Sequence, residues 1–192
     1  MSNLTNSIIK VITISAFALA SGSAIAAKNG TNEGTFFGKE APGKWIIGVK
    51  AGQVDANSEF VEDADAVGLV LGYEFARPIG NNGGSSTVEL EYIKADETPI
   101  SGFGDYEVDM LNLFFTYRTA GTLYFKAKAG ASFSTITLTT PAFDTDVDDV
   151  SLAGGIGLGY RIGDYGVIEL EYSDDTGDND LGVIGLNALL EF

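Results

Sequence analysis

The chain of 192 residues contains neither cysteine nor histidine. Without cysteine, no disulfide framework and no cysteine-based metal site can form. Without histidine, the commonest general base and the commonest metal ligand are missing, which weakens every enzymatic interpretation. The composition therefore predicts a protein that is not an enzyme and needs no cofactor.

Basic residues are also scarce. Lys and Arg together number 11 against 27 Asp and Glu, which gives a formal net charge of -16. A nucleic-acid-binding protein needs a basic surface to contact the phosphates. The charge balance therefore argues against nucleic acid as a partner.

A long apolar run is missing as well. The most apolar stretch, residues 11–20, is too short to cross a bilayer as a helix. It follows the positive charge of Lys10 and precedes the small residues Ser23, Ala24 and Ala26, a pattern typical of a cleaved signal peptide. We predict a signal peptide over residues 1–26, a flexible, glycine-rich lead-in over 27–44, and one folded domain over 45–192.

The chain does contain clear alternation of apolar and charged residues. Residues 167–172 place Ile168, Leu170 and Tyr172 on one face of a strand and Glu169 and Glu171 on the other. The segment 88–92 (Val-Glu-Leu-Glu-Tyr) repeats this motif, and 49–52 (Val-Lys-Ala-Gly) is matched by 127–130 (Ala-Lys-Ala-Gly). These matches align two halves of four strands each.

Alternating segments predict eight strands, over residues 45–54, 64–75, 87–95, 106–118, 122–134, 150–162, 167–173 and 181–192. Short turns alternate with four longer connections, 55–63, 96–105, 135–149 and 174–180, which are acidic and hold almost no basic residues. This arrangement is typical of an even-stranded barrel. The fold class predicted is all-β, an eight-stranded antiparallel up-and-down transmembrane β-barrel.

One face of these strands is apolar and the other carries the charges. In a soluble barrel the apolar face points inward, whereas in a membrane barrel it meets lipid and the charges line the lumen. Because the basic and acidic members nearly balance, we expect paired charges rather than an open channel. The predicted lumen charges are Lys50, Glu74, Glu89, Glu91, Arg118, Lys126, Lys128, Arg161, Glu169, Glu171 and Glu191.

Aromatic residues favour the membrane interpretation, because they fall near the strand ends, where membrane barrels carry aromatic girdles. The predicted girdle residues are Tyr73, Phe75, Tyr117, Tyr160 and Phe192 at the turn ends and Tyr92 and Tyr172 toward the loop ends.

Together, the export signal, the eight amphipathic strands and the terminal aromatic residue resemble the small outer-membrane barrel family of OmpA-type transmembrane domains and OmpX. The resemblance implies that Leu186, Leu190 and Phe192 form the signal read by the barrel-assembly machinery, although Asn187 stands where the family usually has glycine. It also implies location in the cell outer membrane, with membrane lipid and lipopolysaccharide as further partners. Enzymes of this barrel class depend on histidine, which this chain lacks.

Two short motifs weakly resemble ligand-binding motifs. Asp144, Asp146, Asp148 and Asp149 resemble the start of a calcium loop, but Asp149 and Gly155 stand where an EF-hand needs glycine and glutamate. We interpret them as a solvated acidic loop, with weak divalent-cation contact as the alternative. Gly155, Gly157 and Gly159 alternate along a strand, so they are expected to leave lumen space for Lys and Arg side chains.

The function predicted is that of a structural or interaction protein of the outer membrane. Its acidic extracellular loops would be free to meet an external ligand that the sequence does not identify. Because the sequence ends with the last predicted strand, we expect no periplasmic wall-binding domain. The alternatives are a narrow cation-preferring pore and a soluble periplasmic carrier of lipocalin-like shape, which would need its apolar face inside. Lys94, outward at the loop end, is expected to reach a lipid phosphate.

Overall fold

The computed structural model describes residues 43–55, 63–75, 83–100, 104–140, 144–177 and 181–192. The predicted signal peptide and nearly all of the predicted lead-in lie outside these described residues. The described residues include no helix with the length and apolarity that a membrane crossing requires. They form eight strands, which are β1 (Lys44–Asp55), β2 (Ala64–Phe75), β3 (Ser85–Ile100), β4 (Gly104–Arg118), β5 (Leu123–Thr139), β6 (Asp144–Ile162), β7 (Gly166–Asp175) and β8 (Gly182–Glu191).

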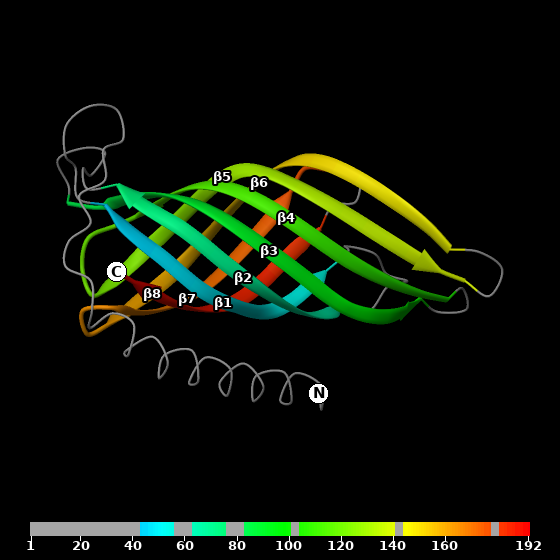
Figure 1. Cartoon of the computed structure of the whole chain (residues 1–192), viewed down its shortest axis with the longest axis horizontal. Coiled ribbons are helices and arrows are strands. Elements are labelled where there is room, and N and C mark those ends of the chain that lie inside the picture. Colours follow the sequence, from blue (N-terminus) through cyan, green and yellow to red (C-terminus); the bar gives the residue numbers. More distant parts are fainter. Residues whose placement is uncertain (1–42, 56–62, 76–82, 101–103, 141–143, 178–180) are drawn as a thin grey trace.

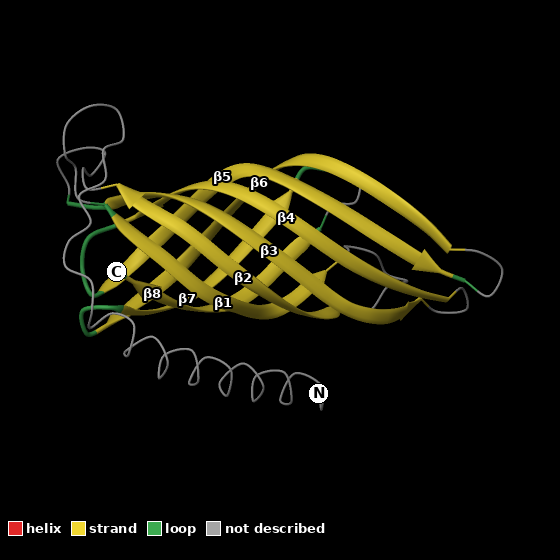
Figure 2. Cartoon of the chain, viewed as in Figure 1, coloured by secondary structure: helices red, strands yellow, loops and turns green. Residues whose placement is uncertain are grey.

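The strands close into a barrel in which each strand pairs antiparallel with its sequence neighbours (Figures 1 and 2). β8 closes the barrel on β1, with Ile46 opposite Glu191 at one end and Asp55 opposite Gly182 at the other. Two backbone bonds between Trp45 and Phe192, of 2.8 and 2.9 Å, extend this seam by one residue. A closed barrel leaves no sheet edge along its wall. The predicted eight-stranded up-and-down fold is confirmed.

The short connections lie at the end of the barrel that carries the chain's C-terminus, here called the turn end (Figure 1). The tightest of them joins β6 to β7 and includes Gly163, whose φ of +63° favours glycine. The opposite end is called the loop end.

At the loop end, three strands are longer than the sequence predicts. β3 continues to Ile100, β5 to Thr139, and β6 begins at Asp144, so most of the two predicted connections 96–105 and 135–149 is strand rather than loop. That prediction was wrong because the alternating β-branched residues 135–139 favour a strand. β6 pairs with β7 only from Ala153 onward, so the end of the β5–β6 hairpin projects beyond β7 (Figure 1).

The outer wall of the barrel is apolar. Leu152 is 71% exposed, and Phe125 and Ile156 are each 69% exposed, on the face predicted to be apolar. Charged side chains of the same strands point inward, where Glu89 and Glu169 are fully buried. The barrel is therefore inverted relative to a soluble one, and the carrier hypothesis, which needs the apolar face inside, was wrong.

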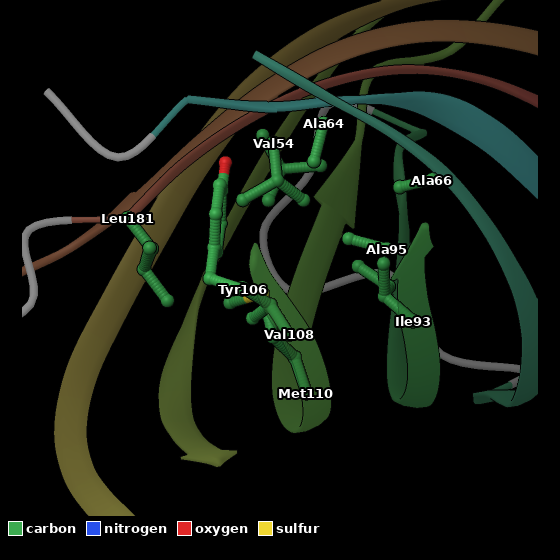
Figure 3. Packing of buried hydrophobic residues seen from close by; sticks show 10 residues of the cluster. Val54, Ala64, Ala66, Ile93, Ala95, Tyr106, Val108, Met110 and Leu181 are labelled. Atoms are coloured by element: carbon green, nitrogen blue, oxygen red, sulfur yellow. The ribbon is translucent and has the colours of Figure 1, made fainter. Parts of the chain in front are cut away.

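The interior has a charged part and an apolar part. The apolar part lies on the loop side and joins small aliphatic residues of β1, β2 and β3 to three larger side chains of β4 (Figure 3). Its buried members are Val54, Ala64, Ala66, Ile93, Ala95, Tyr106, Val108, Met110, Leu181 and Val183. We call it the apolar plug. The charges and glycines predicted for the inward face do not include these residues.

Candidate functional site

The inward charges gather in one cluster, here called the charge network. Its four bases and four acids are each at most 5% exposed, and their formal charges cancel. The members are Lys50, Glu89, Glu91, Arg118, Lys126, Lys128, Glu169 and Glu171. Charges buried at this depth are tolerated only when each one is paired in good geometry.

Half of the charge network forms a closed ring of four ion pairs. Arg118 lies 2.6 Å from Glu89 and 2.7 Å from Glu169. Lys126 lies 3.0 Å from Glu89 and 2.8 Å from Glu169, which completes the ring. Each charge in this ring therefore touches two of opposite sign.

The other half repeats the ring nearer the loop end. Lys50 pairs with Glu91 at 2.6 Å and also with Glu171. Lys128 lies 3.0 Å from Glu91 and 2.7 Å from Glu171. The two rings are joined by Lys126 and Glu171, which are 2.8 Å apart. Lys126 thus contacts three glutamates and forms the junction of the network.

Neutral side chains support the ring that contains Arg118. The Tyr124 hydroxyl donates to Glu169 at 2.6 Å, and the Arg118 guanidinium donates to the Thr87 hydroxyl at 2.9 Å. Hydrogen bonds to charged groups are stronger than those between neutral groups. These two hydrogen bonds orient Glu169 and Arg118, whereas the contacts of Glu89 within the network are ion pairs without hydrogen-bond geometry.

The internal repeat explains how the sequence builds this network. The matched glutamate motifs lie on β3 and β7, and the matched lysine motifs lie on β1 and β5. In the closed barrel β1 faces β5 and β3 faces β7. Around the lumen the lysine strands β1 and β5 therefore alternate with the glutamate strands β3 and β7. Two network members lie outside the two motif pairs, Arg118 on β4 and Lys126 on β5.

Glycines on β6 make room for these side chains. An added Cβ would meet Cε of Lys128 at 3.0 Å if placed on Gly155, and Cβ of Glu171 at 3.1 Å if placed on Gly157. At Gly159 it would overlap the ring of Tyr124. The expectation that these glycines accommodate lumen side chains holds, but the neighbours include a tyrosine and a glutamate as well as a lysine.

Three predicted lumen charges lie apart from the network. Arg161 forms its own pair with Glu191 at the turn end, at 2.8 Å, and Lys44 lies 3.4 Å from the same glutamate. Glu74 is half-buried, and its Oε2 has no hydrogen-bond partner among the described residues. The structure therefore brings eight of the eleven predicted charges together.

The predicted girdle residues lie near the two ends of the outer wall. At the turn end the ring of Trp45, which the girdle prediction omitted, packs edge-on against Tyr73 at 5.1 Å, and Tyr73 packs against Phe75 at 5.6 Å. Tyr160 and Phe192 are exposed and Tyr117 is half-buried. Toward the loop end, Tyr92 donates to Asp109 at 2.7 Å and Tyr172 to Asp174 at 3.3 Å. Their role at a membrane interface stays a prediction.

The predicted assembly residues lie on or beside β8. Leu186 and Leu190 are half-buried on the outer face, and Phe192 is exposed directly after the strand. The backbone of Phe192 also closes the barrel seam with Trp45. Recognition of these residues by an assembly machinery stays a prediction.

The four aspartates considered for calcium lie along β6 rather than in a loop. Asp146 and Asp148 accept hydrogen bonds from Thr137 and Thr135 at 3.0 and 2.8 Å on the outer face. In the part of the chain that the structure describes, no three acidic side chains gather to hold a metal. The prediction of a loop here was therefore wrong, because these residues extend β6.

Lys94 was expected to reach a lipid phosphate, but its ammonium group is already engaged. It pairs with Glu107 and lies 3.5 Å from Asp109 on the neighbouring strand.

The barrel was compared with known proteins. No family model matches the chain, and no curated protein matches it. Its structure resembles that of Ail, the attachment invasion locus protein of Yersinia pestis, with a TM-score of 0.54 and 18% identity over 78% of this chain and 97% of that one. The N-terminal β-barrel domain of Pseudomonas aeruginosa OprF gives a TM-score of 0.54 and 17% identity over 77% of this chain and 97% of that one.

Neisserial surface protein A gives a TM-score of 0.54 and 11% identity over 78% of this chain and 97% of that one. At these identities the likeness concerns the fold. The chain therefore has the fold of the small eight-stranded outer-membrane β-barrels.

Proposed function

We propose that the protein spans the outer membrane and acts as a structural or interaction protein, with its loop end directed outward. The observation that carries this proposal is the inverted barrel, with an apolar wall outside and a neutral charge network inside. An apolar band of this extent on a soluble monomer would drive aggregation, because monomers rarely expose apolar patches larger than a few hundred Å². A surrounding lipid phase removes that cost.

The experiment that tests this proposal is fractionation combined with gel migration. The protein should be recovered from washed outer membranes, and unheated and boiled samples should migrate differently, because a folded barrel resists detergent until it is heated. Recovery in the soluble periplasmic fraction, with no heat-dependent shift, would contradict the proposal.

An interaction role is supported by the projecting part of the sheet. Outward side chains of β4 and β6 in this region include Glu107, Asp109, Asp146 and Asp148, and the only nearby cation among the described residues, Lys94, is already paired. Such a surface concentrates cations and repels anions. A cationic external partner, bound in a salt-dependent manner, fits this surface better than a polyanion. Ail, by contrast, has been solved with a heparin analogue, sucrose octasulfate.

Contact with lipopolysaccharide is part of the same proposal. The apolar wall would meet its acyl chains, whereas the acidic surface beyond the wall would repel its phosphates unless cations lie between them.

The packing of the interior disfavours the cation-pore alternative. All eight members of the charge network are engaged with opposite charges, and the apolar plug lies between them and the loop end. Ions would have to separate the paired charges and pass beside the apolar plug, which is energetically costly. Planar-bilayer recordings on refolded protein should therefore stay silent, and reproducible cation-selective steps would restore the pore hypothesis.

A further inference from the structure

A second polar group lies inside the barrel, on the loop side of the charge network. It consists of four inward-facing side chains on β5 and β6, and we call it the polar patch. Ser134 lies directly opposite Asp149 in the strand register, and Ser132 lies directly opposite Ser151. Directly opposed residues of an antiparallel pair share one face of the sheet, so the four side chains are neighbours.

Every member of the polar patch has a buried oxygen without a hydrogen-bond partner among the residues that the structure describes. These atoms are the hydroxyl oxygens of the three serines and Oδ2 of Asp149. Ser132 is fully buried and Ser134 is 3% exposed. Buried polar atoms in proteins are nearly always satisfied by protein groups, water or ions. Four neighbouring oxygens of this kind offer their lone pairs to water or to a cation.

A second carboxylate approaches the polar patch from β7. Asp175 is 4% exposed, and its Oδ1 accepts hydrogen bonds from the backbone nitrogens of Gly177 and Leu181, at 3.3 and 3.1 Å. Its Oδ2 has no hydrogen-bond partner within the described ranges of the chain. Gly177 lies against the patch, because a Cβ placed on it would overlap Oδ2 of Asp149. Both carboxylates therefore border the same glycine.

The charge at this place is not compensated by side chains. Among the described residues, neither Asp149 nor Asp175 forms an ion pair, and the nearest lumen lysine on β5, Lys128, is engaged with Glu91 and Glu171. Asp175 is buried, whereas Asp149 is half-buried and its Oδ1 accepts a hydrogen bond from the backbone nitrogen of Val150 at 2.8 Å. Burying a carboxylate such as Asp175 without a countercharge is unfavourable. A bound cation would remove that cost.

We propose that the polar patch and Asp175 form a binding site for one Ca²⁺ ion, with Asp149 and Asp175 supplying the charge and the hydroxyls of Ser134 and Ser151 supplying further oxygens. Oxygen-only donors suit hard cations. Ca²⁺ accepts irregular arrangements of about six to eight oxygens, with water completing the shell, whereas Mg²⁺ demands a regular octahedron. With two carboxylates, the dissociation constant is expected on the order of 10⁻⁴–10⁻³ M.

The test is calorimetric titration of CaCl₂ into the folded full-length protein in detergent, after removal of divalent ions. We expect one saturable site per chain. Asp149→Asn, which keeps the side chain's size, should weaken binding at least tenfold, and Ser134→Ala should weaken it to a smaller degree. Asp146→Asn is the matched control, because it removes a carboxylate from the outer face of the same strand, and it should leave the affinity unchanged.

A second readout separates binding from a folding defect in the variants. At a Ca²⁺ concentration about 100 times the wild-type dissociation constant, the ratio of folded to unfolded wild-type protein should rise about 100-fold, whereas that of Asp149→Asn should rise no more than about 11-fold. The proposal is overturned if wild-type protein gives no saturable binding. It is equally overturned if Asp146→Asn and Asp149→Asn weaken binding to the same extent. The site is independent of the proposed function, since it requires no external partner and no pore.

Discussion

Removing the charge of Lys126 should destabilise the barrel more than removing any exposed charge. Its ammonium group lies 2.8 Å from Glu169, 2.8 Å from Glu171 and 3.0 Å from Glu89. Lys126→Met keeps an unbranched side chain of similar length but leaves four buried glutamates facing three bases. The charge network then carries one uncompensated negative charge.

The size of the effect follows from the burial of these groups. Removing one partner of a buried ion pair costs about 3–5 kcal/mol, because the remaining charge stays in a poorly solvated site. We expect the upper half of this range, since Lys126 contacts three glutamates rather than one. A double variant, Lys126→Met with Glu169→Gln, restores neutrality. It should therefore be more stable than the sum of the single changes predicts, with a coupling of about 1–3 kcal/mol.

The assay is urea unfolding of the protein in lipid vesicles, followed by fluorescence. Trp45 is the only tryptophan and lies exposed on the outer wall, so its emission reports departure from lipid. Lys94→Met is the matched control, because its exposed pair with Glu107 should contribute no more than about 1 kcal/mol. Equal losses for Lys126→Met and Lys94→Met, or strict additivity in the double variant, would refute the reasoning.

Three further changes test other parts of the barrel. Gly159→Ala should lower the free energy of unfolding by about 1–3 kcal/mol, because the new methyl group overlaps the ring of Tyr124. Gly154→Ala is the control, and it should leave the free energy of unfolding unchanged in the same urea titration, because its methyl group makes only an ordinary contact. Leu170→Arg, on the exposed apolar wall, should cost about 2–4 kcal/mol in vesicles, and a neutral result would place this residue outside the hydrocarbon layer. Phe192→Ala keeps the backbone bonds between residue 192 and Trp45, so it should slow assembly in cells without changing the stability of the refolded protein. Unchanged assembly would show that the Phe192 ring is not an assembly signal.

Much of the fold could be predicted from alternation alone. The motif at residues 167–172 and its repeat at 88–92 fix which side chains share a face, and the charges on one face are so regular that eight strands emerge in order. The aromatic residues at the strand ends predicted that the apolar face points outward. The strand ends at the loop side were predicted wrongly, because Asp and Thr in residues 135–149 were interpreted as loop residues although Thr and Ile also favour strands. In the structure Asp and Thr bond across β5 and β6.

The pattern of ion pairs could not be predicted from the sequence, for a different reason. Which lysine meets which glutamate depends on the stagger of the strands, and alternation fixes the face of a residue but not its height in the barrel. The apolar plug could have been found, however. The parity that points Glu89 and Glu91 inward also points Ile93 and Ala95 inward, one and two positions further along the same face of β3. The predicted inner face contained only charged residues and glycines, so these aliphatic residues were missed.

The central claim, that the apolar wall faces lipid, is tested most directly by spin labels on single cysteines. The chain has no cysteine to remove first. A nitroxide at Leu170→Cys on the wall should be relaxed strongly by oxygen and weakly by a water-soluble nickel complex when the protein is in vesicles. A label at Ser173→Cys, which points into the barrel, should be shielded from both. Strong relaxation of the Leu170→Cys label by the nickel complex would contradict the account, because it would place the apolar wall in water.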